Sequence, residues 1–127
     1  MTTPTKHVWD DIPHEPLSPL ITRKLVYNDR LMLGQVFLKT GSIVPAHEHH
    51  NEQATYILEG CLRFWIGEHA DHPGDEYVDI HAGEVLLIPG GVRHRAEAIE
   101  DTLDLDVFTP PRQDWIEKTD GYLRGTK

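Results

Sequence analysis

The stretch GSIVPAHEHHNEQATYILEG, residues 41–60, and the later stretch GEVLLIPGGVRH, residues 83–94, decide how this chain folds. Both contain runs of β-branched, aromatic and aliphatic residues that favour extended strands. Glycine stands at the ends of these runs, which is typical of tight turns. The two stretches therefore predict short strands joined by turns, with polar side chains at defined positions along them.

The rest of the chain continues this alternation of short apolar runs and turn residues. No helix of ten or more residues is expected before residue 113, and the sequence has no internal repeat. Many short strands separated by such turns are typical of an all-β barrel or sandwich. The expected strands are ITRKLVYN (21–28), LMLGQVFLK (31–39), QATYIL (53–58), CLRFWI (61–66), YVDI (77–80), VLLI (85–88), residues 94–98 and residues 102–108.

The 127 residues suit one domain of ordinary size, divided into three parts. Residues 1–20 contain four prolines and mixed charges, and they predict an extended N-terminal arm. Residues 21–112 predict the β-barrel. Residues 113–127 predict a short C-terminal tail with one helical turn around residues 113–118.

The formal net charge of −9 and the pI near 5.3 exclude some partners. Nucleic acids and anionic membranes need a basic surface, whereas a small anionic ligand needs only a few local arginines. The single cysteine, Cys61, rules out an intrachain disulfide and is expected to be a small buried residue. The sequence shows no signal-peptide pattern and no apolar run of about 20 residues, so a cytoplasmic location is expected.

Histidines provide the first candidates for chemistry. His47 and His49 form an i, i+2 pair on an extended segment, which directs both imidazoles to one side. With an oxygen donor close behind them, they supply three ligands for a divalent first-row metal. His94 follows a tight turn on a later strand and is the candidate for a fourth ligand. No functional role is expected for the histidines in the predicted arm, loop and turn, which are His7, His14, His69, His72 and His81.

The spacing of these residues resembles the two motifs of the cupin superfamily over residues 22–110. The first motif runs from Gly41 to Gly60, and its histidines and Gln53 stand at the family's intervals, with Gln in place of the usual Glu. The second motif runs from Gly83 to His94. The resemblance implies a double-stranded β-helix, or jelly-roll barrel, that binds one divalent metal ion. The implied ligands are His47, His49, Gln53 and His94.

Glu52 is a rival to Gln53 as the oxygen ligand, and it would add a negative charge. Its spacing after His49 falls outside the family pattern, and alternation directs it away from the face of Gln53. Gln53 is therefore the expected ligand. Three imidazoles and one amide oxygen suit Ni, Mn, Fe, Co or Zn.

Several other conspicuous side chains are expected to be structural. Arg93 and Arg95 flank His94, so alternation along the strand directs them away from it. The three tryptophans are expected to be core or interface anchors, and they are Trp9, Trp65 and Trp115.

The last expected strand has two different faces. Leu103, Leu105 and Val107 share one face, and the other face carries two aspartates, at 104 and 106, with Phe108. An amphipathic strand with its aspartates in water fits this pattern. A barrel strand whose polar face lines the lumen also fits it, and there Asp106 would sit in a partly dry pocket suited to proton transfer.

A second resemblance favours the alternative in which Asp106 faces the lumen. The run DVFTPPR, residues 106–112, is similar to the end of the KdgF family, small cupins that open the ring of 4,5-unsaturated uronates from pectin and alginate. The resemblance implies that Asp106 moves a proton, that Arg112 pairs with the substrate carboxylate, and that Phe108 shapes the pocket. The chain differs from that family in its longer arm, in its longer polar loop at residues 67–76, and in the fifteen residues after Arg112.

The expected function is therefore a metal-dependent, isomerase-like ring opening of a small anionic sugar acid, giving an open-chain deoxy-keto-uronate. One alternative is a cupin dioxygenase that uses Fe or Ni with O₂, and another is a non-enzymatic module that binds a sugar or small acid. A homodimer is expected, because unpaired strand edges need cover.

Overall fold

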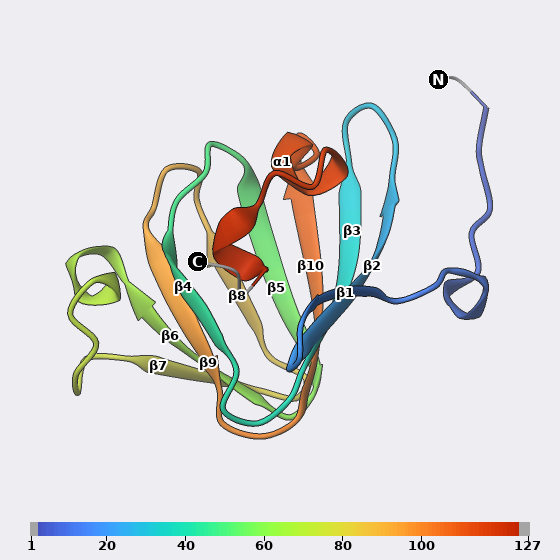
Figure 1. Cartoon of the computed structure of the whole chain (residues 1–127). Coiled ribbons are helices and arrows are strands. Elements are labelled where there is room, and N and C mark those ends of the chain that lie inside the picture. The colour runs from blue at the N-terminus through green and yellow to red at the C-terminus, as the bar shows by residue number, and fades with distance from the viewer. Residues whose placement is uncertain (1–2, 125–127) are drawn as a thin grey trace.

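The computed structural model describes residues 3–124 as two antiparallel sheets that close around a common interior (Figure 1). Within these residues, the larger sheet has the order β1-β2-β3-β10-β5-β8 and the smaller one the order β4-β9-β6-β7. No helix in this part of the chain is long and apolar enough to cross a membrane. The strands are β1 Glu15–Ser18, β2 Ile21–Tyr27, β3 Met32–Leu38, β4 Ile43–His47, β5 Glu52–Glu59, β6 Cys61–Ile66, β7 Val78–His81, β8 Val85–Ile88, β9 His94–Ala98 and β10 Thr102–Thr109.

Side-chain alternation builds the core. Strand β3 alternates buried and half-buried residues along its whole length, because successive side chains of a strand point to opposite faces of its sheet. The inward residues of both sheets pack into one cluster, in which Met32, Ile57 and Phe108 are almost completely buried. The all-β prediction is confirmed, because all the strand pairs are antiparallel and the helical segments are short.

Strand β10 lies at the centre of the larger sheet, between β3 and β5. Its buried face carries Asp104, Asp106 and Phe108, whereas the leucine and valine side chains of the opposite face are half-buried. The prediction that both aspartates are in water is therefore wrong. The prediction that this face of the strand lines the lumen is confirmed. Apolar side chains remain exposed on the outer face of the same sheet, where Leu87 is 72% exposed. The homodimer stays a prediction.

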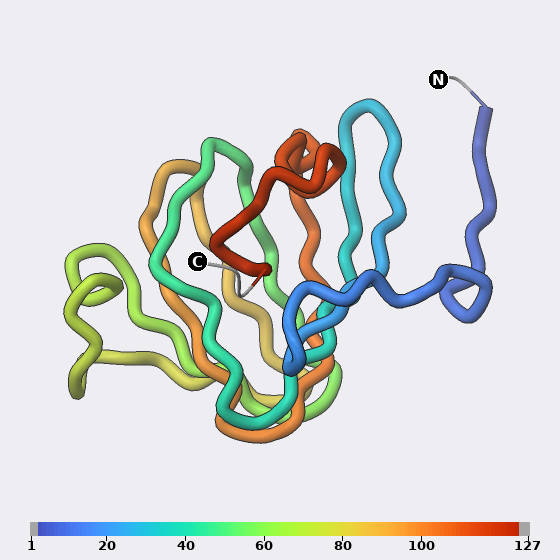
Figure 2. The backbone as a smooth tube through the Cα atoms, in the orientation of Figure 1, coloured from blue at the N-terminus to red at the C-terminus, as the bar shows by residue number. Residues whose placement is uncertain are grey.

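Two segments near the ends of the described chain, residues 15–18 and 113–124, pack against the barrel. Residues 15–18, within the predicted arm, pair with β2 as an edge strand, and Leu17 is buried. The predicted helical turn is confirmed as α1, Gln113–Ile116, which is followed by the 3₁₀ turn η3, Gly121–Leu123. The trace in Figure 2 shows this C-terminal segment crossing between the two sheets.

Gly60 joins β5 to β6 with φ of 93°, a left-handed conformation that side chains with a Cβ rarely adopt. A Cβ there would also overlap the carbonyl oxygen of Asp101, whereas one on Gly41, at φ of 87°, would meet nothing. We expect Gly60→Ala to lower the free energy of unfolding by about 3 kcal/mol and Gly41→Ala by about 1 kcal/mol, measured by urea denaturation. Equal losses would show that the overlap at Gly60 does not matter.

Candidate metal centre

Three histidines meet at one end of the barrel interior. His47 ends β4 and pairs in register with His94, which begins β9, while His49 lies in the turn before β5. Their ring nitrogens lie within 4.8 Å of one another. The predicted convergence is confirmed, but its cause differs in part. Strand β4 ends at His47, so the path of the following turn brings His49 to the cluster.

Each imidazole is oriented by the backbone. All three Nδ1 atoms lie within hydrogen-bonding distance of a carbonyl oxygen, so Nδ1–H donates and Nε2 carries the lone pair. The Nε2 atom of His94 is buried and has no hydrogen-bond partner among the described residues. A buried nitrogen of this kind needs an electron-pair acceptor, and a metal ion supplies one. The carbonyl contacts are His47 with Pro45 at 2.8 Å, His49 with Asn51 at 3.1 Å and His94 with Val92 at 2.9 Å.

Burial keeps these rings neutral. It lowers the pKa of His47 to about 3, assisted by the nearby His94, and lowers the pKa of His49 to about 4, assisted by Arg112. Burial lowers the pKa of His94 as well. Neutral imidazole is the form that coordinates a metal, so the three rings are ready ligands at neutral pH.

Gln53 directs its carbonyl oxygen toward this cluster. The amide nitrogen of Gln53 donates to the hydroxyl of Thr55 at 2.8 Å, and that hydroxyl donates to Asp106 at 2.8 Å, which fixes the orientation of the amide. Gln53 Oε1 then lies 3.0 Å from Nε2 of His49. Because the ring is neutral and its proton is on Nδ1, two lone pairs face each other across this contact. A cation between them removes the conflict, so the residues fit a divalent metal.

Glu52 lies outside the site, as its position in the alternation predicts. Its side chain is turned to the outside of β5, where one carboxylate oxygen accepts a hydrogen bond of 2.6 Å from the backbone N–H of Gly90. Of the two rival oxygen ligands, only Gln53 faces the histidines.

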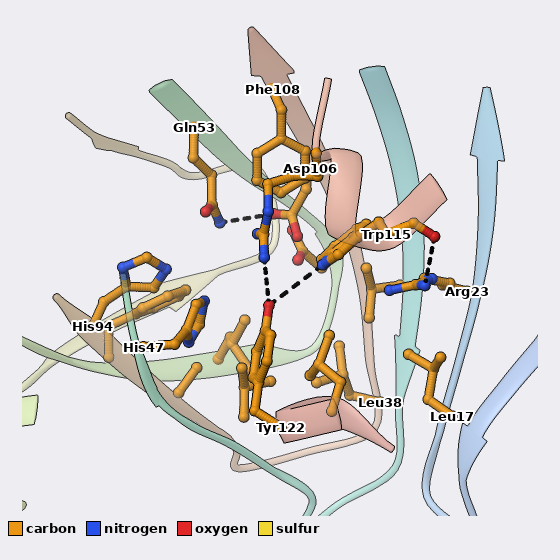
Figure 3. Close-up of a pocket in the computed structure, with 18 residues that line it drawn as sticks. Leu17, Arg23, Leu38, His47, Gln53, His94, Asp106, Phe108, Trp115 and Tyr122 are labelled. Atoms are coloured by element: carbon orange, nitrogen blue, oxygen red, sulfur yellow. Dashed lines mark hydrogen bonds between the residues drawn. The ribbon is translucent and has the colours of Figure 1, made fainter. Parts of the chain in front are cut away.

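Two buried aspartates line the cavity together with His47 and His94, and Figure 3 shows Asp106 there. Asp106 is 6% exposed and Asp104 only 3%, and Oδ1 of Asp104 has no hydrogen-bond partner among residues 3–124. Burial raises the pKa of both, and the neighbouring Asp106 raises the pKa of Asp104 further. A proton shared between two close carboxyl groups is the expected consequence. The strand alternation predicts Asp104 on this face, but the resemblance to the KdgF family implies a role for Asp106 alone.

Arg112 is buried in the cavity wall, directly after β10. Its Nε and Nη2 atoms bind both oxygens of Asp114, at 3.0 and 2.9 Å, and Nη2 also donates to the Tyr122 hydroxyl at 2.7 Å. The guanidinium lies over the rings of Phe108 and Trp115. One edge of the guanidinium is therefore already occupied by the chain's own carboxylate, and Nη1 is left without a hydrogen-bond acceptor among residues 3–124.

The cavity between these groups has a volume of about 40 Å³ and is lined by both sheets and by the C-terminal segment (Figure 3). Sequence reasoning missed Tyr122, whose ring stacks on His47 with a centroid distance of 4.5 Å. It also missed Arg23, which reaches the cavity from β2. Neither residue lies in a motif, and no local pattern in the sequence marks them.

The arginines beside His94 point away from it, as alternation predicts. Arg93 binds Asp71 with both edges of its fork, at 2.7 and 2.8 Å, and Arg95 lies over the ring of Trp65. Both therefore belong to the outer surface of the smaller sheet.

A second group of potential metal ligands lies on that same surface, where Cys61, Asp79 and His81 are neighbours on β6 and β7. Both oxygens of Asp79 are bound by Arg63, at 2.7 and 3.0 Å, so its charge is already balanced. Burial raises the pKa of the Cys61 thiol, which disfavours the thiolate that binds metals. The group is an ion-paired sheet surface.

These observations define a β-barrel with a three-histidine cluster at one end of its interior, and the comparisons agree with that class. A family model described as the cupin domain matches residues 34–109, so the chain belongs to the cupin domain family. None of the curated proteins matches the chain.

Solved structures share the fold at low identity. KdgF from Halomonas sp. is 24% identical with a TM-score of 0.78, covering 89% of this chain and 99% of that one. An RmlC-like cupin from Shewanella frigidimarina is 20% identical with a TM-score of 0.77, covering 89% and 96%. Oxalate decarboxylase from Bacillus subtilis is 20% identical with a TM-score of 0.69, covering 87% of this chain but only 30% of that one.

Substituting single residues tests which side chains bind the metal. We expect His94→Ala to abolish stoichiometric binding of Ni²⁺ or Mn²⁺ and Gln53→Ala to weaken it by about tenfold, because the amide supplies one weaker ligand and aligns its neighbours. Elemental analysis and titration calorimetry measure both effects. His81→Ala, on the outer sheet surface, is the control and should bind metal as the wild type does.

The buried Asp104 should make stability depend on pH. Its raised pKa means that the folded state keeps a proton that the unfolded state has lost, so stability falls as pH rises. We expect Asp104→Asn, which cannot ionise, to gain stability relative to the wild type between pH 5 and pH 8 in urea denaturation. Asp101→Asn is the control, because the Asp101 pKa is lowered and both states are ionised there. A constant difference for Asp104→Asn would contradict the prediction.

Proposed function

We propose that this cupin is a metal-dependent enzyme that opens the ring of a small unsaturated sugar acid. The observation that carries the proposal is that Asp106, Arg112 and Phe108 line one cavity together with His47 and His94, while the Phe108 ring also contacts His49. Residues 106–112 resemble the KdgF family, and the fold similarity to KdgF from Halomonas sp. spans nearly all of that chain. The similarity supports the fold, and the cavity residues support the chemistry.

The metal site determines where the substrate oxygens would lie. His47, His49, Gln53 and His94 would hold the ion, and a divalent cation supplies Lewis acidity that stabilises negative charge on oxygen. Arg112 would bind the substrate carboxylate through its free Nη1, while Asp114 holds the other edge of the guanidinium in place. Phe108 packs against both His49 and the guanidinium, which restricts the position of a bound ring.

Asp106 is suited to move the proton. Burial raises its pKa towards the working pH, where a general acid/base is most effective, and the hydroxyl of Thr55 fixes the carboxyl group in position. As a carboxylate it would remove the proton of the anomeric hydroxyl while the bond between the anomeric carbon and the ring oxygen breaks. The electron pair then resides on the ring oxygen as an enolate. Return of the proton to the enolate carbon gives an open-chain keto-uronate, an isomer of the substrate.

Turnover of unsaturated galacturonate tests this function directly. We expect purified, metal-loaded protein to accelerate the decay of its ultraviolet absorbance, and we expect a chelator to abolish the effect until metal is added back. Decay no faster than in buffer rejects the proposal. Oxygen consumption with an enol substrate would indicate the dioxygenase alternative.

Asp106→Asn should keep the fold and the metal but lose the proton transfer. We expect kcat to fall by about 100-fold or more, the usual contribution of a general acid/base. Metal content by elemental analysis should stay at the wild-type level. A variant with wild-type kcat would remove Asp106 from the mechanism.

A further inference from the structure

The C-terminal segment, residues 113–124, forms one wall of the cavity, to which it contributes Trp115, Tyr122 and Leu123. Helix α1 packs on β3, where the ring of Trp115 lies against Gly34, and η3 lies against β4, so the segment bridges the two sheets. With the segment in place, the cavity of about 40 Å³ holds roughly three water molecules. A sugar-acid ring is several times larger. Seating such a ring in this cavity, beside Arg112 and Asp106, therefore requires the segment to move.

An ion-pair network attaches the far end of the segment to the barrel, and the Arg112–Asp114 pair holds its start. Asp120 binds Arg23 in a fully buried pair, and Arg124 bridges Asp120 at 3.0 Å and Glu15 at 2.7 Å. Movement of the segment would expose both partners of the buried pair to water together. That costs less than leaving one charge buried alone. The network thus stabilises the segment against the barrel and still allows it to detach and rebind.

Tyr122 is the polar side chain that the segment brings to the cavity. Its hydroxyl oxygen accepts hydrogen bonds from Nη2 of Arg112 at 2.7 Å and from the indole of Trp115 at 3.3 Å. Both lone pairs are then used, and the hydroxyl proton has no acceptor among residues 3–124. The ring is stacked on His47 and lines the cavity (Figure 3). The free O–H is therefore available to a ligand beside the metal centre.

We propose that residues 113–124 form a lid that opens to admit a uronate and closes to set the Tyr122 hydroxyl against the ligand's carboxylate, next to Arg112. This rests on the proposed function for the class of ligand, but it assigns a new contacting residue and a route of entry. Two adjacent donors, one of them charged, match a carboxylate better than a sugar hydroxyl. Tyr122 would thus select for the acid over the neutral sugar.

Hydrogen exchange of the full-length, metal-loaded protein with galacturonate tests the lid. Galacturonate has the carboxylate and ring but lacks the double bond, so it binds without turnover. We expect amides of residues 113–124 to exchange faster than those of β3 and β10, and to slow by about tenfold or more at saturating galacturonate. Asp120→Asn should speed exchange in the segment by a similar factor and leave the strands unchanged.

Tyr122→Phe keeps the stacked ring and removes only the hydroxyl. We expect it to weaken galacturonate binding by about tenfold in titration calorimetry, and to change binding of neutral galactose less than about twofold. Tyr27→Phe, the same change at an exposed tyrosine on β2, is the matched control and should bind galacturonate normally.

Each outcome decides the proposal. Unchanged exchange in residues 113–124 on binding, no binding of galacturonate, or equal affinity in Tyr122→Phe overturns it. Protection of the segment and a Tyr122 effect, without turnover of unsaturated galacturonate, support the lid and reject only the ring-opening chemistry. Turnover without protection of the segment supports the ring-opening chemistry and rejects the lid.

Discussion

The rest of the site depends on the direction of three lone pairs. Each imidazole gives its Nδ1 proton to a backbone carbonyl, so the Nε2 atoms of His47, His49 and His94 all face the same small space. Burial keeps them neutral, and Gln53 adds a fourth electron pair whose direction its own amide contacts determine. Electron pairs arranged in this way repel one another until a cation is bound, which is why the group is best understood as a metal centre.

Strand β10 connects that centre to the proposed chemistry. At the middle of the larger sheet, its inward face places Asp104 and Asp106 in a dry interior, an unfavourable position for two carboxylates. Raised pKa values relieve this cost, because a protonated carboxyl group carries no charge into the interior. The same burial that would destabilise an ordinary strand therefore gives Asp106 the raised pKa on which its proposed role depends.

The C-terminal segment supplies one wall of the cavity between the two sheets. It contributes Trp115 and Tyr122 to the wall and orients Arg112 through contacts from two directions. The barrel belongs to the cupin domain family, but these contacts come from residues beyond the matched range of 34–109. The surroundings of the metal centre are therefore shaped by residues that the family motifs do not include.

The sequence by itself determined the all-β fold and the four candidate ligands. Glycine turns, short apolar runs and motif spacing are local signals, which can be recognised from residues close together in the sequence. It also placed Asp106, Phe108 and Arg112 near the site through resemblance. Only the tertiary structure decided which face of β10 is buried, how the backbone turn positions His49, and that Tyr122 and Asp120 reach back to residues far away in the chain. Contacts between distant segments depend on the packing of whole sheets, and no local pattern of residues records them.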